Sequence, residues 1–416
     1  MGKYFSDAVD QALEAIYYTY DGEKAAAAVQ PLTGAANAGD GDASYILSRC
    51  LSGPQYSWAY HPFRDDDEAV ERLVRQSIRQ GSAMGVLGAM RCGMLTPEME
   101  EAMKAHYPTL RDAWNAVYEK AEAGCLFCMN MIGNTYFWLD VPRIEGKGPN
   151  DFPGREAFGA YLRETELKCI PWFQRAFEGG MGFAGKNLYV LYNDGEEGII
   201  PPDKAKAEAV VRLGAEKGYP DWQERYAALL KGDDNWTQEV FDLYRAAAAQ
   251  GQLSSWFYVG FAYELGKVGP KDCVKAMECY EKGLADTERV GCPNRAGRLL
   301  YLGQDGIAQN YARAVELLER AHTLGSTWGS DILGSCYLFG HGCQKDPVRA
   351  RTLFQEKDSL SDLGKYGMGV IYTEGLGVPQ DIKKGVEYFQ KAPNYAPAQE
   401  ALLHFKKTLF GKWVRR

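Results

Sequence analysis

A CxxC motif is the feature of this chain whose residue types and spacing most directly suggest chemistry. Cys125 and Cys128 could bind zinc or exchange a disulfide, but they lie in an apolar stretch, 125–136, that we predict to be a helix. A zinc site of this type needs a second such pair or nearby histidines, and the sequence places neither there. We therefore expect a buried structural pair of thiols.

A second pair, Cys336 and Cys343, flanks a Gly-rich turn next to His341. Three potential ligands on one such turn make a poor metal site. The N-terminus has no basic region followed by an apolar stretch and a cleavage site, so we expect no secretion signal and a cytoplasmic protein with reduced thiols. We predict no metal and no cofactor.

Catalytic patterns give no support to an enzyme, although a helical chain of this size could be an α/α-barrel hydrolase. The five histidines include no pair at i, i+4, which excludes a zincin-type helix, and no Gly-x-Ser-x-Gly or Walker motif is present. The acidic residues that can be placed fall mostly at predicted helix starts, where they cap backbone N–H groups. We predict a protein that catalyses nothing.

A repeated pattern defines the elements that hold these residues. An aromatic ends one apolar segment, a Gly-rich turn follows, and nine residues after the aromatic an Asp or Asn opens a second segment. The tyrosines are 38, 36 and 35 residues apart, and a fixed period of this size indicates a solenoid. The four pairs are Tyr263 with Asp272, Tyr301 with Asn310, Tyr337 with Asp346, and Tyr372 with Asp381.

The second segment of each unit is also regular, with Lys or Arg at plus three, a small residue at plus four and a large apolar residue at plus eight. The small and large positions share one helix face, so the small residue lets a partner helix approach closely. Examples are Asp272, Lys275, Ala276 and Tyr280; Asn310, Arg313, Ala314 and Leu318; Asp346, Arg349, Ala350 and Phe354; Asp381, Lys384, Gly385 and Phe389; and, earlier, Asp203, Lys206, Ala207 and Val211.

These residues resemble the Sel1-like repeat family, a branch of the tetratricopeptide-like solenoids. The unit that matches best contains Leu333, Gly334, Tyr337, Gly340, Gly342, Asp346, Arg349 and Ala350. The resemblance implies an all-α fold, a right-handed αα-superhelix of about ten helix-turn-helix repeats with a capping helix at the C-terminus.

Weaker copies of the pattern extend the repeats toward the N-terminus at irregular intervals. They place the ends of first helices at Leu229, Tyr192, Tyr136, Met90, Cys50 and Thr19. We therefore expect one solenoid over 1–416, with an irregular part in 1–200, regular repeats in 201–392 and a cap in 393–416 whose helix covers 396–409.

The resemblance also implies which residues bind a partner, because certain first-helix positions near the helix glycine line the groove in tetratricopeptide-like hairpins. Asn130 and Asn134 share a helix face and could hydrogen-bond a peptide backbone, with Trp138 as an apolar anchor. Core packing is at least as good an explanation for Phe137. The implied groove residues are Asn130, Asn134, Phe137, Trp138, Phe257, Phe261, Glu264, Asp331 and Tyr366.

Two insertions interrupt the repeats. The first, 53–64, is rich in rings, including Tyr56, Trp58 and Tyr60, and the second, 140–165, lengthens a turn by Pro and Gly residues. Insertions fall on one edge of a solenoid, often next to the ligand. Either these segments bind a ligand or they fold back and fill a weakly stacked part of the protein.

Charge and composition limit the choice of partner. The net charge of −8 disfavours nucleic acid, and no stretch of about 20 apolar residues predicts membrane insertion. The basic residues after 405 suit the C-terminal end of a helix, or an anionic partner. We predict a scaffold that binds a protein or peptide on its concave face. The alternative is a small molecule or cell-wall glycan fragment bound by the aromatic insertion.

Overall fold

The computed structural model describes residues 4–19, 21–52, 65–195, 200–356 and 360–416. Helices dominate these residues, and their single sheet is a two-stranded antiparallel pair near the C-terminus. The predicted all-α fold of helix-turn-helix repeats is confirmed. None of the described helices is both long and apolar enough to span a bilayer.

The chain divides into two compact units. The N-terminal unit comprises 1–235 and 242–252, and the C-terminal unit comprises 236–241 and 253–416. The continuity of the repeats as one solenoid across both units stays a prediction.

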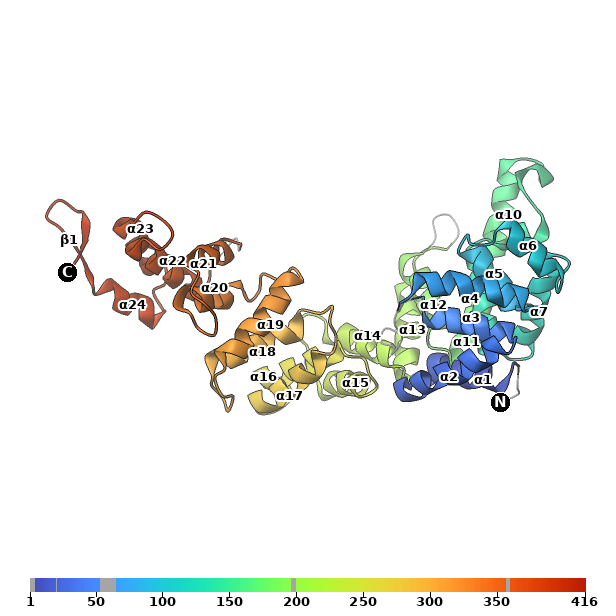
Figure 1. The fold of residues 1–416 in the computed structure, drawn as a ribbon, viewed down its shortest axis with the longest axis horizontal. Coiled ribbons are helices and arrows are strands. Elements are labelled where there is room, and N and C mark those ends of the chain that lie inside the picture. Colours follow the sequence, from blue (N-terminus) through green and yellow to red (C-terminus); the bar gives the residue numbers. More distant parts are fainter. Residues whose placement is uncertain (1–3, 20, 53–64, 196–199, 357–359) are drawn as a thin grey trace. The chain divides into compact units, whose positions relative to one another are not determined.

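The N-terminal unit is a succession of short helices, coloured blue to green in Figure 1. Its helices are α1 (Asp7–Leu13), continued by a π-helical turn (Glu14–Tyr18), α2 (Gly22–Asn37), α3 (Gly41–Cys50), α4 (Asp67–Arg79), α5 (Ala83–Arg91), α6 (Pro97–Lys104), α7 (Leu110–Glu122), α8 (Leu126–Phe137), α9 (Val141–Glu145), a 3-10 turn (Pro149–Asp151), α10 (Arg155–Leu167), α11 (Cys169–Gly179), α12 (Ala184–Asp194), α13 (Lys204–Glu216) and α14 (Pro220–Lys231). Helix α15 (Gln238–Ala249) is shared between the units, since its residues up to Phe241 belong to the C-terminal unit and those from Asp242 onward belong to the N-terminal unit.

The C-terminal unit consists of regular helix pairs followed by a small hairpin (Figure 1). Its elements are α16 (Ser255–Leu265), α17 (Cys273–Gly283), α18 (Gly291–Leu302), α19 (Tyr311–Thr323), α20 (Ser330–Phe339), α21 (Pro347–Gln355), α22 (Asp362–Glu374), α23 (Ile382–Gln390), α24 (Ala396–Leu402), β1 (Phe405–Lys407) and β2 (Trp413–Arg415).

The second helix of each regular repeat begins at the predicted Asp or Asn. The Asp346 carboxylate accepts a hydrogen bond from the backbone N–H of Arg349 at 2.9 Å, which satisfies a donor that the helix leaves open. The backbone N–H of Asp346 in turn donates to the carbonyl of Tyr337, also at 2.9 Å, and closes the turn. Asp203, Asp272, Asn310 and Asp381 form equivalent side-chain caps.

Within a repeat, a glycine of the first helix lies against the large apolar residue of the second. A Cβ atom added at Gly334 would lie 2.7 Å from Cε1 of Phe354, so only glycine fits without a shift of the ring. The same contact joins Gly260 to Tyr280, Gly297 to Leu318 and Gly369 to Phe389. This contact fixes how closely the two helices of a pair approach.

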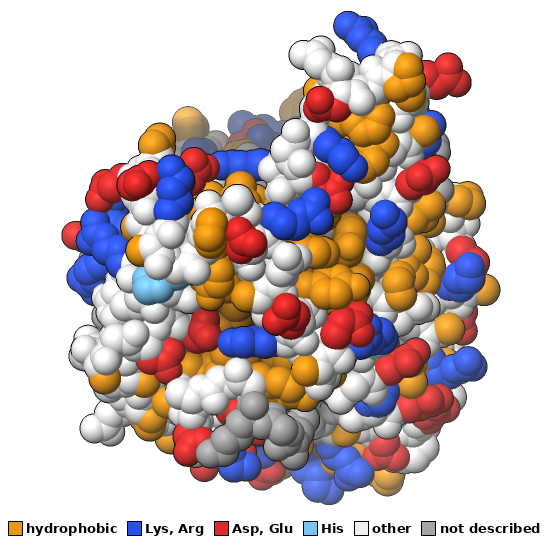
Figure 2. Space-filling view, turned by 90° about the vertical axis from the view of Figure 1, so that its right-hand side faces the viewer, with side chains coloured by type: hydrophobic (Ala, Val, Ile, Leu, Met, Phe, Trp, Pro, Cys, Tyr) orange, Lys and Arg blue, Asp and Glu red, His pale blue; other side chains and the backbone are white. Residues whose placement is uncertain are grey.

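The irregular repeats end where the sequence predicted. The first-helix ends expected at Cys50, Met90, Tyr136, Tyr192 and Leu229 lie within two residues of the ends of α3, α5, α8, α12 and α14. The end expected at Thr19 directly follows the π-helical turn. Apolar side chains in this unit lie recessed between charged ones, as Figure 2 shows for one face.

Three expectations about local structure need correction. The insertion 140–165 is not a lengthened turn, because its Pro and Gly residues begin and end short helices: Pro142 stands in the first turn of α9, and Gly146 ends it in the left-handed conformation. An additional helix, α6, was not predicted. The expected capping helix over 396–409 ends at Leu402, and a β-hairpin follows.

Candidate functional site

The strongest candidate site is a pocket in the N-terminal unit where the first helices α3, α5 and α8 lie next to one another. Close approach of α3 and α5 depends on Gly88, because a Cβ atom there would lie 2.4 Å from Cε2 of Tyr45. Helix α8 packs closely against α11 in the same way, since Gly133 faces the ring of Phe173. Three helices are thereby fixed around one space.

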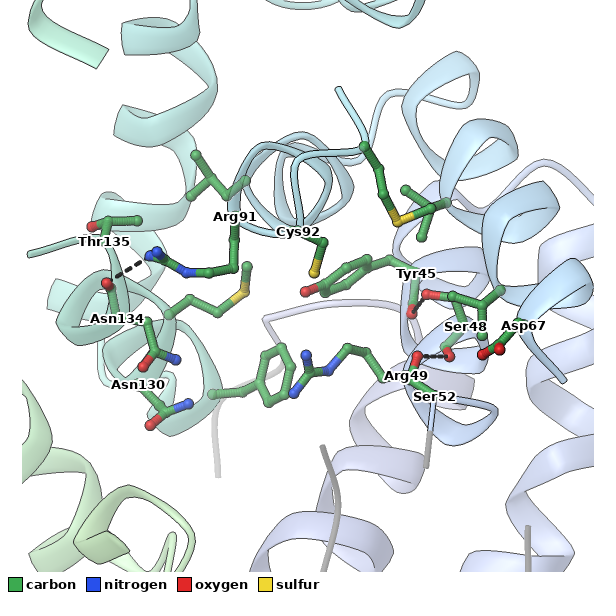
Figure 3. Close-up of a pocket in the computed structure, with 17 residues that line it drawn as sticks. Tyr45, Ser48, Arg49, Ser52, Asp67, Arg91, Cys92, Asn130, Asn134 and Thr135 are labelled. Atoms are coloured by element: carbon green, nitrogen blue, oxygen red, sulfur yellow. Dashed lines mark hydrogen bonds between the residues drawn. The ribbon is translucent and has the colours of Figure 1, made fainter. Parts of the chain in front are cut away.

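We call this space the Asn130 pocket. Its volume is about 270 Å³. Figure 3 shows side chains from α3 on one side, α8 on the other and α5 between them. The pocket is lined by Tyr45, Ser48, Arg49, Ser52, Asp67, Val70, Val74, Leu87, Gly88, Arg91, Cys92, Met94, Phe127, Asn130, Met131, Asn134 and Thr135.

Asn130 is the most informative polar residue of the pocket. It is 3% exposed, and its Oδ1 makes no hydrogen bond within the described part of the chain. A buried amide oxygen without a donor costs about 1–3 kcal/mol. Groups of this kind mark places where a ligand can supply the missing bond.

Arg49 brings positive charge to the same space. Its side chain extends from α3 across the pocket toward α8 (Figure 3). It lies beside Tyr17, a fully buried residue; burial raises the pKa of Tyr17 to about 12, although Arg49 opposes the rise. Tyr17 is therefore neutral at physiological pH and does not cancel the guanidinium charge.

Arg91, at the end of α5, connects the pocket to its rim. Its guanidinium donates to the backbone carbonyl of Asn134 at 2.7 Å and forms an ion pair with Asp140. The same group lies over the ring of Trp138, 5.6 Å from the centroid. The described lining residues thus include two arginines and one carboxylate, the exposed Asp67.

The ion pair at the rim has an unusual carboxyl group. Burial raises the pKa of Asp140 to about 6, while the guanidinium groups of Arg91 and Arg143 oppose that rise. Arg143 itself pairs with Glu100 at 2.9 Å. The Asp140 carboxyl therefore holds a proton at a higher pH than an ordinary aspartate does.

The predicted residues on α8 have different roles. Asn134 lines the pocket, but its Oδ1 already accepts a hydrogen bond from Asn187 at 3.0 Å. Phe137 packs against Phe173 with ring centroids 6.2 Å apart, so it belongs to the core. Trp138 is 59% exposed and contacts the site through Arg91.

Two predicted residues of the C-terminal unit, Phe261 and Glu264, belong to a cluster of polar and aromatic side chains. Glu264 is buried and accepts hydrogen bonds from Tyr280 at 2.7 Å, Arg295 at 3.2 Å and Arg298 at 3.1 Å. The Arg295 guanidinium lies between the rings of Phe261 and Trp328, 4.8 Å from each centroid. Glu264 serves here as the internal counter-ion of two arginines.

The other predicted residues of this unit are mainly structural. The Phe257 ring faces Gly291, where an added Cβ would lie 2.6 Å from it, and Tyr366 packs on Phe389. Asp331 is 5% exposed on α20. Tyr56, Trp58 and Tyr60, proposed for the aromatic insertion, lie outside the described residues.

The cysteines are free thiols, and all ten of them are in described parts of the chain. Cys125 precedes the first residue of α8 and is buried with Cys128. A hydrogen bond from Cys128 lowers the pKa of Cys125, and burial raises that of Cys128. No cluster of metal-binding side chains occurs among the described residues.

Sequence reasoning missed the two arginines of the pocket. Arg49 and Arg91 each precede a cysteine at the end of a first helix. Cations are common at helix ends because they complement the dipole, so this position alone does not distinguish them. The repeated Arg-Cys pair at two first-helix ends was the available signal.

Capped helix pairs that cross at a glycine define the class of the chain, an α-helical repeat protein. Within this chain, the Sel1 repeat model matches residues 183–219, 257–285, 294–326, 332–356 and 363–392. These five segments are Sel1 repeats, which confirms the resemblance on which the prediction was based.

Several curated proteins share part of this sequence. The chain is 29% identical over 175 residues to ERAD-associated E3 ubiquitin-protein ligase component HRD3A of Arabidopsis thaliana, a match covering 39% of this chain and 24% of that protein. It is 30% identical over 174 residues to DAP3-binding cell death enhancer 1 of Rattus norvegicus, covering 41% and 33%. It is also 30% identical over 131 residues to Chitin synthase regulatory factor 1 of Schizosaccharomyces pombe, covering 30% and 28%. The chain thus spans a third or less of each of these relatives.

Two solved structures are similar over most of the chain. One is c5321, a protective antigen of uropathogenic Escherichia coli, with 18% identity, a TM-score of 0.43 and coverage of 90% of this chain and 89% of that one. The other is a Sel1 repeat protein from Oxalobacter formigenes, with 18% identity, a TM-score of 0.42 and coverage of 97% and 96%.

Proposed function

We propose that this chain is a non-catalytic scaffold whose N-terminal unit binds an extended segment of a partner protein through the Asn130 pocket. The observation that carries the proposal is the Asn130 carboxamide, which is buried with an acceptor that no described group satisfies. A carboxamide can accept from a peptide N–H and donate to a peptide C=O, so it suits a backbone of any sequence.

The rest of the pocket supports a peptide ligand. Arg49 and Arg91 bring positive charge to the lining, and Val70, Val74 and Leu87 supply an apolar wall. The volume of about 270 Å³ is near the lower end for small-molecule sites, which favours one inserted side chain. Because the helices around the pocket are fixed by glycine contacts, little ordering is needed on binding.

The names of the relatives agree with a scaffold role. They describe a ligase component, a DAP3-binding protein and a regulatory factor. The alternative of a small molecule or glycan bound by the aromatic insertion rests on residues outside the described ones.

A displayed library of random peptides, panned against the full chain, would test the proposal. Peptides that bind should lose at least about tenfold in affinity, or about 1.4 kcal/mol, in Asn130→Leu. Asn150→Leu, at an exposed position, is the matched control and should bind as the parent does. If no peptide is enriched, or if the enriched peptides bind Asn130→Leu as tightly as the parent, the pocket is not the binding site.

A further inference from the structure

The C-terminal hairpin exposes two large apolar side chains at its tip. Thr408 and Lys412 close a three-residue loop through a hydrogen bond of 2.8 Å from the Thr408 N–H to the Lys412 carbonyl. Gly411 ends the loop with a φ of +77°, as a type I turn with a bulge requires. Leu409 and Phe410 occupy the centre of the turn and are 102% and 98% exposed.

The base of this hairpin is anchored in the C-terminal unit. Phe405 is buried against Phe389 and Ala398, and the backbone N–H of Arg416 donates to the His404 carbonyl at 2.9 Å. Arg415 forms an ion pair with Glu374 on α22. The hairpin follows α24 at the end of the red helices in Figure 1. The tip is therefore presented by a fixed base.

Positive charge is concentrated around the tip. Residues 401–416 contain five Lys or Arg and no Asp or Glu, so the remaining chain carries 42 basic and 55 acidic residues, a net charge of 42 − 55 = −13. Lys406, Lys407 and Lys412 are exposed and have no ion-pair partner among the described residues. The helix-dipole explanation of this basic run fails, because α24 ends at Leu402.

We propose that this hairpin binds the surface of an anionic lipid bilayer, with Leu409 and Phe410 inserted between head groups and the surrounding lysines on the phosphates. Lipid suits this surface better than an acidic protein, because the apolar groups form a small convex tip instead of a face. Leucine and aromatic side chains partition into the boundary of head groups and acyl chains, and each nearby cation adds attraction to an anionic surface. Such binding is peripheral and requires no spanning helix.

Sedimentation of the full chain with vesicles tests this proposal. Vesicles of phosphatidylcholine containing phosphatidylserine should bind the parent, vesicles of phosphatidylcholine alone should not, and added salt should weaken binding. Leu409→Ser with Phe410→Ser should reduce binding by about tenfold or more. Leu403→Ser, at a 65% exposed position outside the hairpin, is the control and should bind normally.

A second variant reports insertion directly. The fluorescence of Phe410→Trp should be quenched by lipids with a nitroxide on the acyl chain, beyond any quenching of the parent, which has nine tryptophans. The proposal is overturned if vesicles with phosphatidylserine do not bind the parent, or if they bind the Ser double variant equally well. An acidic protein would then be the better candidate partner of the hairpin. The Asn130→Leu variant should bind vesicles as the parent does, so the two proposals fail separately.

Discussion

Asn130 links stability and binding at the scale of a single residue. Replacing Asn130 by an apolar residue should make the protein more stable, because a buried amide oxygen without a hydrogen-bond donor is costly. A group that costs stability without serving the fold is best explained by a ligand.

We expect Asn130→Leu to raise the free energy of unfolding by about 1 kcal/mol, because leucine has a similar size and removes the unsatisfied acceptor. Asn134→Leu should lower it instead, since it deprives Asn187 of its acceptor at 3.0 Å. Urea unfolding of both variants measures the difference. If Asn130→Leu is the less stable of the two, Asn130 serves the fold and our interpretation of the pocket is wrong.

The Asp140 carboxyl predicts that the stability of the fold depends on pH. A carboxyl whose pKa rises to about 6 in the folded protein favours folding when it is protonated. Its contribution is therefore complete below the unfolded pKa of about 4 and is lost as the pH rises through about 6. Arg91 from α5 and Arg143 from α9 face this carboxyl, and Glu100 from α6 pairs with Arg143.

Between pH 4 and pH 7, the parent should accordingly lose roughly 2 kcal/mol of unfolding free energy relative to Asp140→Asn. Urea titrations at several pH values measure it, and the asparagine variant controls for all other titrating groups. A difference that shifts in favour of the parent as the pH rises would mean that the arginines hold the pKa of Asp140 below its ordinary value.

The sequence predicted part of this site. The i, i+4 spacing on a helix next to a glycine was enough to identify Asn130 and Asn134 as neighbours, but it could not show that Asn187 already satisfies Asn134. Arg49 comes from a helix far away in the sequence, and only the packing of α3 against α5 at Gly88 brings it to Asn130. Contacts of this range leave no periodic signal.

At the scale of elements, the glycine contact within each helix pair is the repeated structural unit. We expect Gly334→Ala to destabilise the protein by about 1–3 kcal/mol, because its methyl group would lie 2.7 Å from the Phe354 ring. Gly269→Ala is a suitable control, since no atom lies within 4 Å of the added carbon.

Thermal unfolding followed by circular dichroism measures both variants. Phe354→Leu should partly rescue Gly334→Ala by making room for the methyl group, so the two changes should not be additive. Equal midpoints for the parent and Gly334→Ala would show that the two helices can separate without cost.

Elements were predictable where their boundaries depend on local chemistry. Asp346 and its equivalents begin helices because they cap them, and these positions were identified from the sequence alone. Helix α9 and the terminal hairpin were missed, because prolines and glycines were interpreted as loop residues and the basic run as a helix end. In the structure, Pro142 and Gly146 bound a helix and Gly411 closes a turn.

At the scale of the whole molecule, each of the two compact units has hydrophobic clusters of its own among the described residues. We therefore expect a fragment of residues 236–416 to fold alone, with a helical circular dichroism spectrum and a cooperative thermal transition. Gly334→Ala should lower the midpoint of this fragment as it does in the full chain. A fragment without helical signal would show that the C-terminal repeats need the N-terminal unit as a template.

The binding of a peptide segment in the Asn130 pocket is the central claim, and Cys92 allows it to be measured without any substitution. Cys92 lines the pocket and is exposed, whereas the other cysteines are buried except for the half-buried Cys343 in the C-terminal unit. Alkylation of each thiol by iodoacetamide can be followed by mass spectrometry with and without a peptide selected by panning. We predict that the bound peptide slows alkylation of Cys92 by about tenfold or more and leaves Cys343 unchanged. An unchanged rate at Cys92 in the presence of saturating peptide would contradict the claim.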